Sequence, residues 1–147
     1  MTFHSTLTGA AVWPADLVTA GIVSTAAHVY VGRRPRMIPQ TDRSVRLERL
    51  PKDSVEEYGH QRVTAHPYLL HVLESDSKGP KQSGGALVTA VDAALEAVVD
   101  RYHGTRPFVA SLPLIVAVTA EEEEFDEDPD TGLVQTGAVR VTFYVKE

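Results

Sequence analysis

The sequence predicts an α+β fold, in which one amphipathic helix packs on a mostly antiparallel sheet of about five strands. Two observations predict this class. One is a single apolar stripe on the segment from about Gly84 to His103, where apolar residues recur at i, i+4, i+8, i+11 and i+15: Leu87, Val91, Leu95, Val98 and Tyr102. The other is a pair of alternating segments at the C-terminus that predicts a long β-hairpin. Three shorter strands and a weaker N-terminal helix come before the main helix.

The N-terminal segments are justified by local signals. Residues 13–27 are compatible with a helix, because Pro14 suits a first turn and Asp16 favours the positive helix end, although Gly21 is unfavourable within it. Residues 28–31 read as a short strand that Gly32 ends. Residues 44–50 alternate apolar and polar side chains, which is typical of a half-exposed strand.

The next segments are a polar loop and a third strand. Residues 51–61 carry many polar side chains and Gly59, so we expect a mobile surface loop. Residues 68–73 are almost continuously apolar and predict a strand. Because Pro67 lacks a backbone N–H, it is expected at the start of that strand or at a sheet edge.

The main helix and the hairpin complete the fold. Ser83 is the expected N-cap of the helix and Gly104 its C-terminal stop. In the first hairpin strand the alternating residues are Leu114, Val116 and Val118. In the second, one face carries Val139, Val141, Phe143 and Val145, and the other carries Arg140, Thr142, Tyr144 and Lys146.

Length and composition favour one globular domain over residues 1–147. The 147 residues are 43% hydrophobic and 23% charged, with no cysteine. This excludes disulfides, thiol catalysis and cysteine-ligated metals. No apolar run reaches the roughly 18–20 residues that span a bilayer, and the N-terminus lacks the basic region of a signal peptide. We therefore expect no membrane association.

Charge is distributed very unevenly. Residues 121–130, EEEEFDEDPD, contribute −8 to a net charge of −6, so the rest of the chain sums to +2. Residues 33–52 hold seven basic residues against two acids. Such a dipolar chain can pair with copies of itself or with another charged surface. It does not resemble a nucleic-acid binder, in which positive charge dominates.

Known catalytic and ligand motifs fail when their spacing is checked. Residues 126–137 begin like a calcium loop, but the glycine falls at position 7 instead of 6 and Gly137 stands where a bidentate Glu is needed. Residues 79–85 lack the Gly-Lys-Ser/Thr of a phosphate loop. The clustered histidines, His60, His66 and His71, do not have the spacing of a helical zinc site. We therefore expect no catalytic residues, no metal, no cofactor and no enzyme activity.

Three acids share one face of the main helix. Asp92, Glu96 and Asp100 follow one another at i, i+4 and i+8. Each like-charged pair at this spacing destabilises a helix by ~0.2–0.5 kcal/mol. A solvated helix face is the simplest interpretation, but taken together with the acidic decapeptide these residues favour a deliberately acidic surface.

The chain from about Leu17 to Glu147 resembles the tail terminator proteins of long-tailed bacteriophages. The likeness rests on VYVGRRP after the first segment, HPYLLHV at the third strand, the Gly-opened helix, and the hairpin ending GAVRVTFYVKE. It implies a virion protein, made in the host cytoplasm, that forms a homohexameric ring. The ring would cap the tail tube protein, end tube polymerisation and join the head-side connector or stopper protein. DNA would pass through it without specific binding.

The resemblance also implies roles for particular residues. Carboxylates lining the channel would repel DNA, and the candidates are Glu121, Glu122, Glu123, Glu124, Asp126, Glu127, Asp128, Asp130, Asp92, Glu96 and Asp100. The acidic run could instead meet a basic patch of a neighbouring subunit, formed by Arg33, Arg34 and Arg36. The 51–61 loop is a candidate contact with the tube, through Lys52, Asp53, Glu56, Glu57 and Tyr58.

Other classes stay open. Another neck component, such as a head completion or stopper protein, or the tail tube protein itself, would share a ring and an acidic channel. A small α+β enzyme or ligand-binding protein would need a pocket with convergent polar groups. An oligomeric adaptor could use the same dipolar surface.

Overall fold

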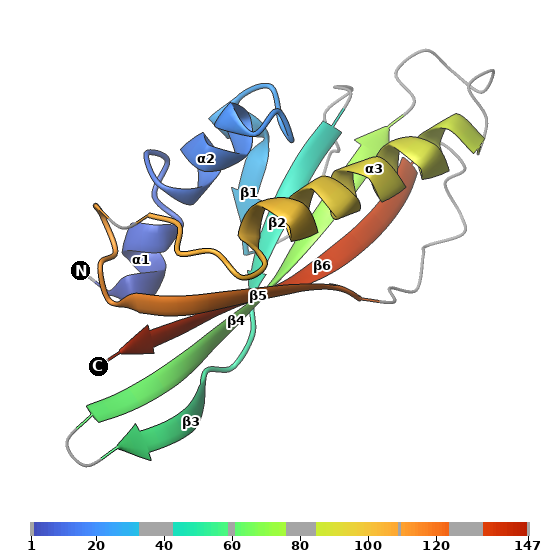
Figure 1. Cartoon of the computed structure of the whole chain (residues 1–147). Helices are drawn as coiled ribbons and strands as arrows, with labels where there is room; N and C mark the ends of the chain where they lie inside the picture. Colours follow the sequence, from blue (N-terminus) through green and yellow to red (C-terminus); the bar gives the residue numbers. More distant parts are fainter. Residues whose placement is uncertain are drawn as a thin grey trace.

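The computed structural model of the chain describes residues 2–32, 43–58, 61–75, 85–108, 110–123 and 134–146. Its elements are α1 (Phe3–Leu7), α2 (Trp13–Thr19), a 3-10 turn η1 (Ala26–His28), β1 (Val29–Val31), β2 (Arg43–Arg49), β3 (Asp53–Tyr58), β4 (Gln61–Ser75), α3 (Gly85–Tyr102), β5 (Ile115–Glu123) and β6 (Val134–Lys146). The helix α3 crosses one face of a twisted sheet, and α1 and α2 lie on the same side (Figure 1).

The sheet has six strands and is mostly antiparallel. Its order is β1-β2-β4-β6-β5, and β3 pairs with β4 beside this path. Among the strand pairs in the described ranges, β1–β2 is parallel and the others are antiparallel. The predicted α+β class, a mostly antiparallel sheet with one main helix, is therefore confirmed; in place of the one N-terminal helix expected, the chain forms two short ones, α1 and α2.

The longest strands, β4 and β6, form the spine of the sheet. Residues 63–75 of the 15-residue β4 pair with β6 along one edge, and the other edge is shared by β2, opposite residues 68–74, and by β3, opposite residues 61–65. Pro67 lies in the gap between them, where its carbonyl accepts a hydrogen bond from Leu50 N at 3.0 Å. The N–H and the C=O of a strand residue point to the same side, and here that side faces away from β6. The missing N–H of Pro67 therefore removes no hydrogen bond between β4 and β6. The expectation of a strand start or sheet edge was wrong.

Three other local expectations need correction. The segment predicted to be a polar loop contains the strand β3. The backbone of β3 pairs with β4, and the two strands form a hairpin. The N-terminal helix ends at Thr19 and not at Ala27, because Gly21 adopts a left-handed φ of 74° that stops it. In the first hairpin strand a β-bulge between Ile115 and Ala117 changes the alternation. As a result Ile115 is buried while Leu114 and Val116 are 55% and 40% exposed.

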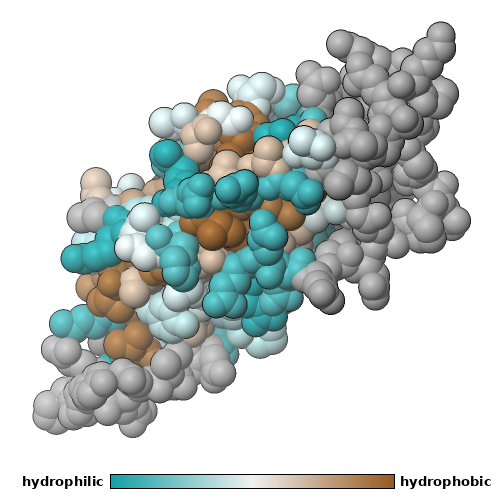
Figure 2. Space-filling view, turned by 45° about the vertical axis from the view of Figure 1, so that its right-hand side comes forward, coloured by the Kyte–Doolittle hydropathy of each residue, from teal (hydrophilic) through white to brown (hydrophobic). Residues whose placement is uncertain are grey.

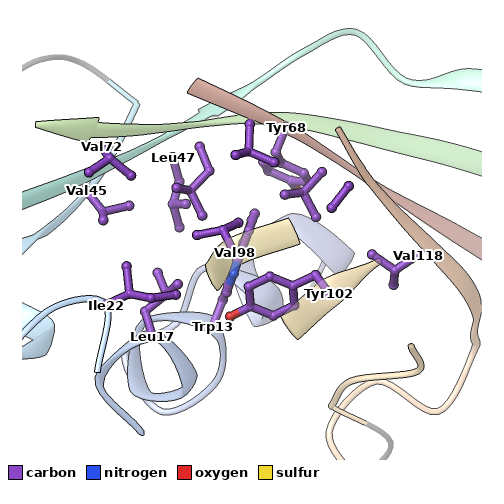
Figure 3. Packing of buried hydrophobic residues seen from close by; sticks show 14 of the residues in the cluster. Trp13, Leu17, Ile22, Val45, Leu47, Tyr68, Val72, Val98, Tyr102 and Val118 are labelled. Atoms are coloured by element: carbon purple, nitrogen blue, oxygen red, sulfur yellow. The ribbon is translucent and has the colours of Figure 1, made fainter. Parts of the chain in front are cut away.

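The core lies between the sheet and the three helices. Four stripe residues of α3 are buried against it: Val91, Leu95, Val98 and Tyr102. On β6 the predicted inward residues are all buried: Val139, Val141, Phe143 and Val145. Trp13 packs edge-on against Tyr68 and Phe143, with ring centroids 5.3 and 5.1 Å away. Figure 3 shows Trp13 and Leu17 facing α3 and the sheet.

A polar contact joins α2 to the end of α3. The Arg101 guanidinium donates two hydrogen bonds to the Asp16 carboxylate, at 2.8 and 2.6 Å, and the Tyr102 hydroxyl donates a third at 2.7 Å. Burial alone would raise the pKa of Asp16, but these hydrogen bonds outweigh it and lower the pKa below its usual value. The contact therefore orients the α2 segment that delivers Trp13 to the core.

Candidate functional site

The acidic residues of α3 lie on the side of the helix that faces β5. Asp92, Glu96 and Asp100 are all exposed. His103 follows Glu96 by seven residues, which is about two helical turns, so the two side chains lie on the same side of the helix. The ring of His103 accepts a hydrogen bond from Ala120 N of β5 at 3.0 Å, and this side therefore faces β5. Since β5 is an edge strand, the stripe Asp92, Glu96, Asp100 lies on the side of α3 nearest that edge of the sheet.

The end of β5 adds a carboxylate to the same region. Glu122 pairs across the sheet with Val139, whose side chain is buried on the helix face, so Glu122 points to the α3 side and is exposed. Glu121 and Glu123 point to the opposite face, where Arg140 Nε donates to Glu123 at 2.6 Å. We call Asp92, Glu96, Asp100 and Glu122 the acidic flank. The other acids, Glu124, Asp126, Glu127, Asp128 and Asp130, lie outside the described residues.

The acidic flank has no compensating charge in the described part of the chain. None of its four carboxylates forms an ion pair with a described residue. In Figure 2 hydrophilic residues form a broad band across the middle of the molecule. Hence the sequence-predicted acids of α3 and one of the three described acids of β5 are exposed carboxylates, unpaired among the described residues, on the helix side of the sheet.

The predicted basic patch, Arg33, Arg34 and Arg36, also lies outside the described residues. Two basic residues of β2, Arg43 and Arg46, contact other side chains. Arg43 Nε donates to Glu74 at 2.7 Å, and Arg46 lies 3.1 Å from His71 Nε2, which is 2.8 Å from Glu48. Burial lowers the pKa of His71, although the hydrogen bond with Glu48 opposes this. Arg43 and Glu74 pair on the helix face of the sheet, whereas Arg46, Glu48 and His71 contact one another on the opposite face. These residues are therefore structural partners of one another.

The predicted tube-contact loop takes a different form. Lys52 is exposed, but Asp53, Glu56, Glu57 and Tyr58 belong to β3 and not to a loop. The β3–β4 hairpin extends beyond the helices at one end of the sheet (Figure 1). The prediction of a loop was wrong, whereas contact with a tube stays a prediction for this hairpin.

A cavity that the sequence did not reveal lies at the same end of the sheet. It has a volume of about 510 Å³ and lies between α1, the end of β2, His66 of β4, the end of β6, and residues 111–115. Its described lining holds three cationic side chains and no acid, namely Arg49, Lys52 and Lys146, and we call it the cationic groove. None of the three forms an ion pair with a described residue.

The groove has an aromatic and imidazole wall. His66 is buried beside Phe3, with ring centroids 4.6 Å apart, and His4 Nδ1 lies 2.9 Å from the Tyr68 hydroxyl. Burial lowers the pKa of His4, and the charge of Arg49 lowers it further. Burial raises the pKa of Tyr68 to about 12 against the effect of Arg49. Both pKa shifts favour the uncharged form of the side chain, and the cations that line the groove are Arg49, Lys52 and Lys146.

No described residues form a group of three or more metal-ligating side chains. None of the helices in the described ranges is long and apolar enough to cross a membrane. Comparison of the sequence with protein-family models and with curated proteins gave no match. Function must therefore be argued from the acidic flank and the cationic groove.

Proposed function

We propose that this protein is a bacteriophage tail terminator: a homohexameric ring that caps the tail tube and connects it to the head-side protein. The observation that carries the proposal is the acidic flank, which adds to the order of elements that the family resemblance implies. In a ring, this flank would face the channel through which DNA moves.

The energetics of the acidic flank favour a role outside the monomer. Two like-charged pairs at i, i+4 on α3 each destabilise the helix by ~0.2–0.5 kcal/mol, and Glu122 adds a further negative charge on the same side. No described cation offsets them. A channel that allows DNA to slide must not bind phosphate, and fixed carboxylates repel it at short range.

The proposal is tested by reversing the acidic flank. The variant Asp92→Lys/Glu96→Lys/Glu122→Lys should still form rings on tubes, yet particles built with it should release DNA more slowly or not at all. The matched control reverses Glu121 alone, which lies on the opposite face of β5. Normal DNA release by the flank variant would refute an acidic channel. Loss of rings in that variant alone would place the flank at a subunit contact instead.

A second candidate function has its own supporting observation. The cationic groove, lined by three cationic side chains together with polar and apolar residues, suits an anionic ligand. A ligand-binding protein would saturate with a small anion and stay monomeric.

A head completion, stopper or tube protein would form rings too. A tube protein, however, would stack repeatedly, whereas a terminator adds one layer at one tube end.

A further inference from the structure

The cationic groove lies at one end of the paired strands β5 and β6, and Glu121–Glu123, the described start of the acidic run, lie at the other end. Ile115 of β5 and Lys146 of β6 line the groove, while Glu123 pairs with Ala138 at the other end. Eight residues of extended strand separate Ala138 from Lys146, which is ~26 Å at about 3.3 Å per residue. The described hairpin is paired throughout this length, so residues 121–123 cannot fold back to the groove of their own chain.

We propose that the cationic groove binds the acidic segment 124–130 of a second copy of this chain. This inference rests on the proposed ring, because it names the contact that would join neighbouring subunits. It replaces the earlier expectation that the acidic segment meets Arg33, Arg34 and Arg36.

Charge complementarity supports this occupant. The groove offers Arg49, Lys52 and Lys146 without an acid in its described lining, and residues 124–130 carry Glu124, Asp126, Glu127, Asp128 and Asp130. The segment also holds Phe125 and Pro129. Leu112, Pro113 and the 55% exposed Leu114 line the groove and provide apolar surface for them. In Figure 2 hydrophobic patches reach the surface toward the lower left, which is the α1 end of the molecule.

The symmetry of such a contact has a consequence. Because the groove and the acidic segment are different surfaces, the contact between subunits is head-to-tail. A row of subunits that has not closed therefore keeps one free groove at one end and one free acidic segment at the other. Association of this kind ends only by closing a ring; otherwise it continues as a filament. A contact between opposite ends of one long sheet is therefore suited to a ring-forming protein.

The absence of cysteine allows a direct test by disulfide trapping. Leu114→Cys puts a thiol on the groove and Phe125→Cys puts one in the acidic segment, and neither change alters charge. Under mild oxidation the mixture of these two single variants should give a linked dimer of about 32 kDa, twice the 16.0 kDa of the chain. The control mixture pairs Phe125→Cys with Ala97→Cys, which is exposed on α3. Equal linking in both mixtures, or none in the first, would overturn the proposal.

Charge reversal adds a second measurement that does not depend on the thiols. Introducing Arg49→Glu/Lys146→Glu in the groove variant should slow linking by about tenfold or more, as for close charge pairs across an interface. Introducing Glu127→Lys/Asp128→Lys in the other partner should restore the rate. Unchanged linking after groove reversal, or no restoration by the swap, contradicts the proposed contact.

The outcomes separate this inference from the proposed function. Rings that form on tubes without the Leu114–Phe125 link would refute the groove contact and leave the terminator proposal standing. A specific link in a protein that never caps a tube would support the contact and refute the terminator proposal.

Discussion

The Asp16–Tyr102–Arg101 contact allows a quantitative test of how α2 is held on α3. We consider Asp16→Ala, which removes the acceptor of three hydrogen bonds. The Tyr102 hydroxyl belongs to a fully buried side chain, and a buried donor left without an acceptor costs ~1–3 kcal/mol. The ion pair is partly solvated, with side-chain exposures of 37% for Arg101 and 21% for Asp16, so its loss costs at most ~1 kcal/mol.

The total expected loss in the free energy of unfolding is about 2–3 kcal/mol, most of which depends on the hydroxyl of Tyr102. In a Tyr102→Phe background no donor is stranded, so Asp16→Ala should cost only about 1 kcal/mol. Urea unfolding of the four proteins, followed by tryptophan fluorescence, completes this double-mutant cycle. Equal costs of Asp16→Ala in the two backgrounds would refute the assignment of the stabilisation to the buried hydroxyl.

Three further predictions follow from the packing and the pKa shifts. Gly137→Ala should destabilise the fold by ~1–3 kcal/mol, because a Cβ there would lie 2.8 Å from the side chains of both Leu95 and Val91; an unchanged Tm would contradict this close packing. The lowered pKa of Asp16 adds stability above its unfolded pKa, so this part is lost as pH falls below about 4; Asp16→Asn should remove that component from a pH series of urea midpoints. The lowered pKa of His71 means that protonation favours unfolding, so stability should fall as pH drops below about 6.5; His71→Gln should flatten that part of the profile, and an identical slope would refute it.

The elements that the sequence predicted well are those with strong periodicity. The stripe of α3 and the alternation of β6 follow from side-chain spacing alone, and Gly104 ends the helix with a φ of 73° as its position predicts. The strand β3 escaped detection because its DSVEEY sequence is polar and its pairing with β4 is a matter of backbone hydrogen bonds. The alternation of β5 failed at the bulge, which inserts a residue that no periodicity reveals.

The candidate sites differ in how far the sequence could predict them. The stripe Asp92, Glu96, Asp100 was visible from i, i+4 spacing, but that Glu122 points to the same side of the sheet depends on the strand register and on the packing of α3 against β5. The cationic groove draws its side chains from separate parts of the chain, α1, the end of β2, residues 111–115 and the last residues of β6. No local pattern joins His4, Arg49 and Lys146, so only the folded chain brings them together.

The central claim is that the chain forms a closed ring that caps a tail tube. The most direct measurement is negative-stain electron microscopy of the purified protein at high concentration, alone and mixed with tail tubes. The account predicts closed rings of about 96 kDa, six times the 16.0 kDa of the chain, or a single added layer at one tube end. A monodisperse monomer that leaves tubes uncapped would contradict it.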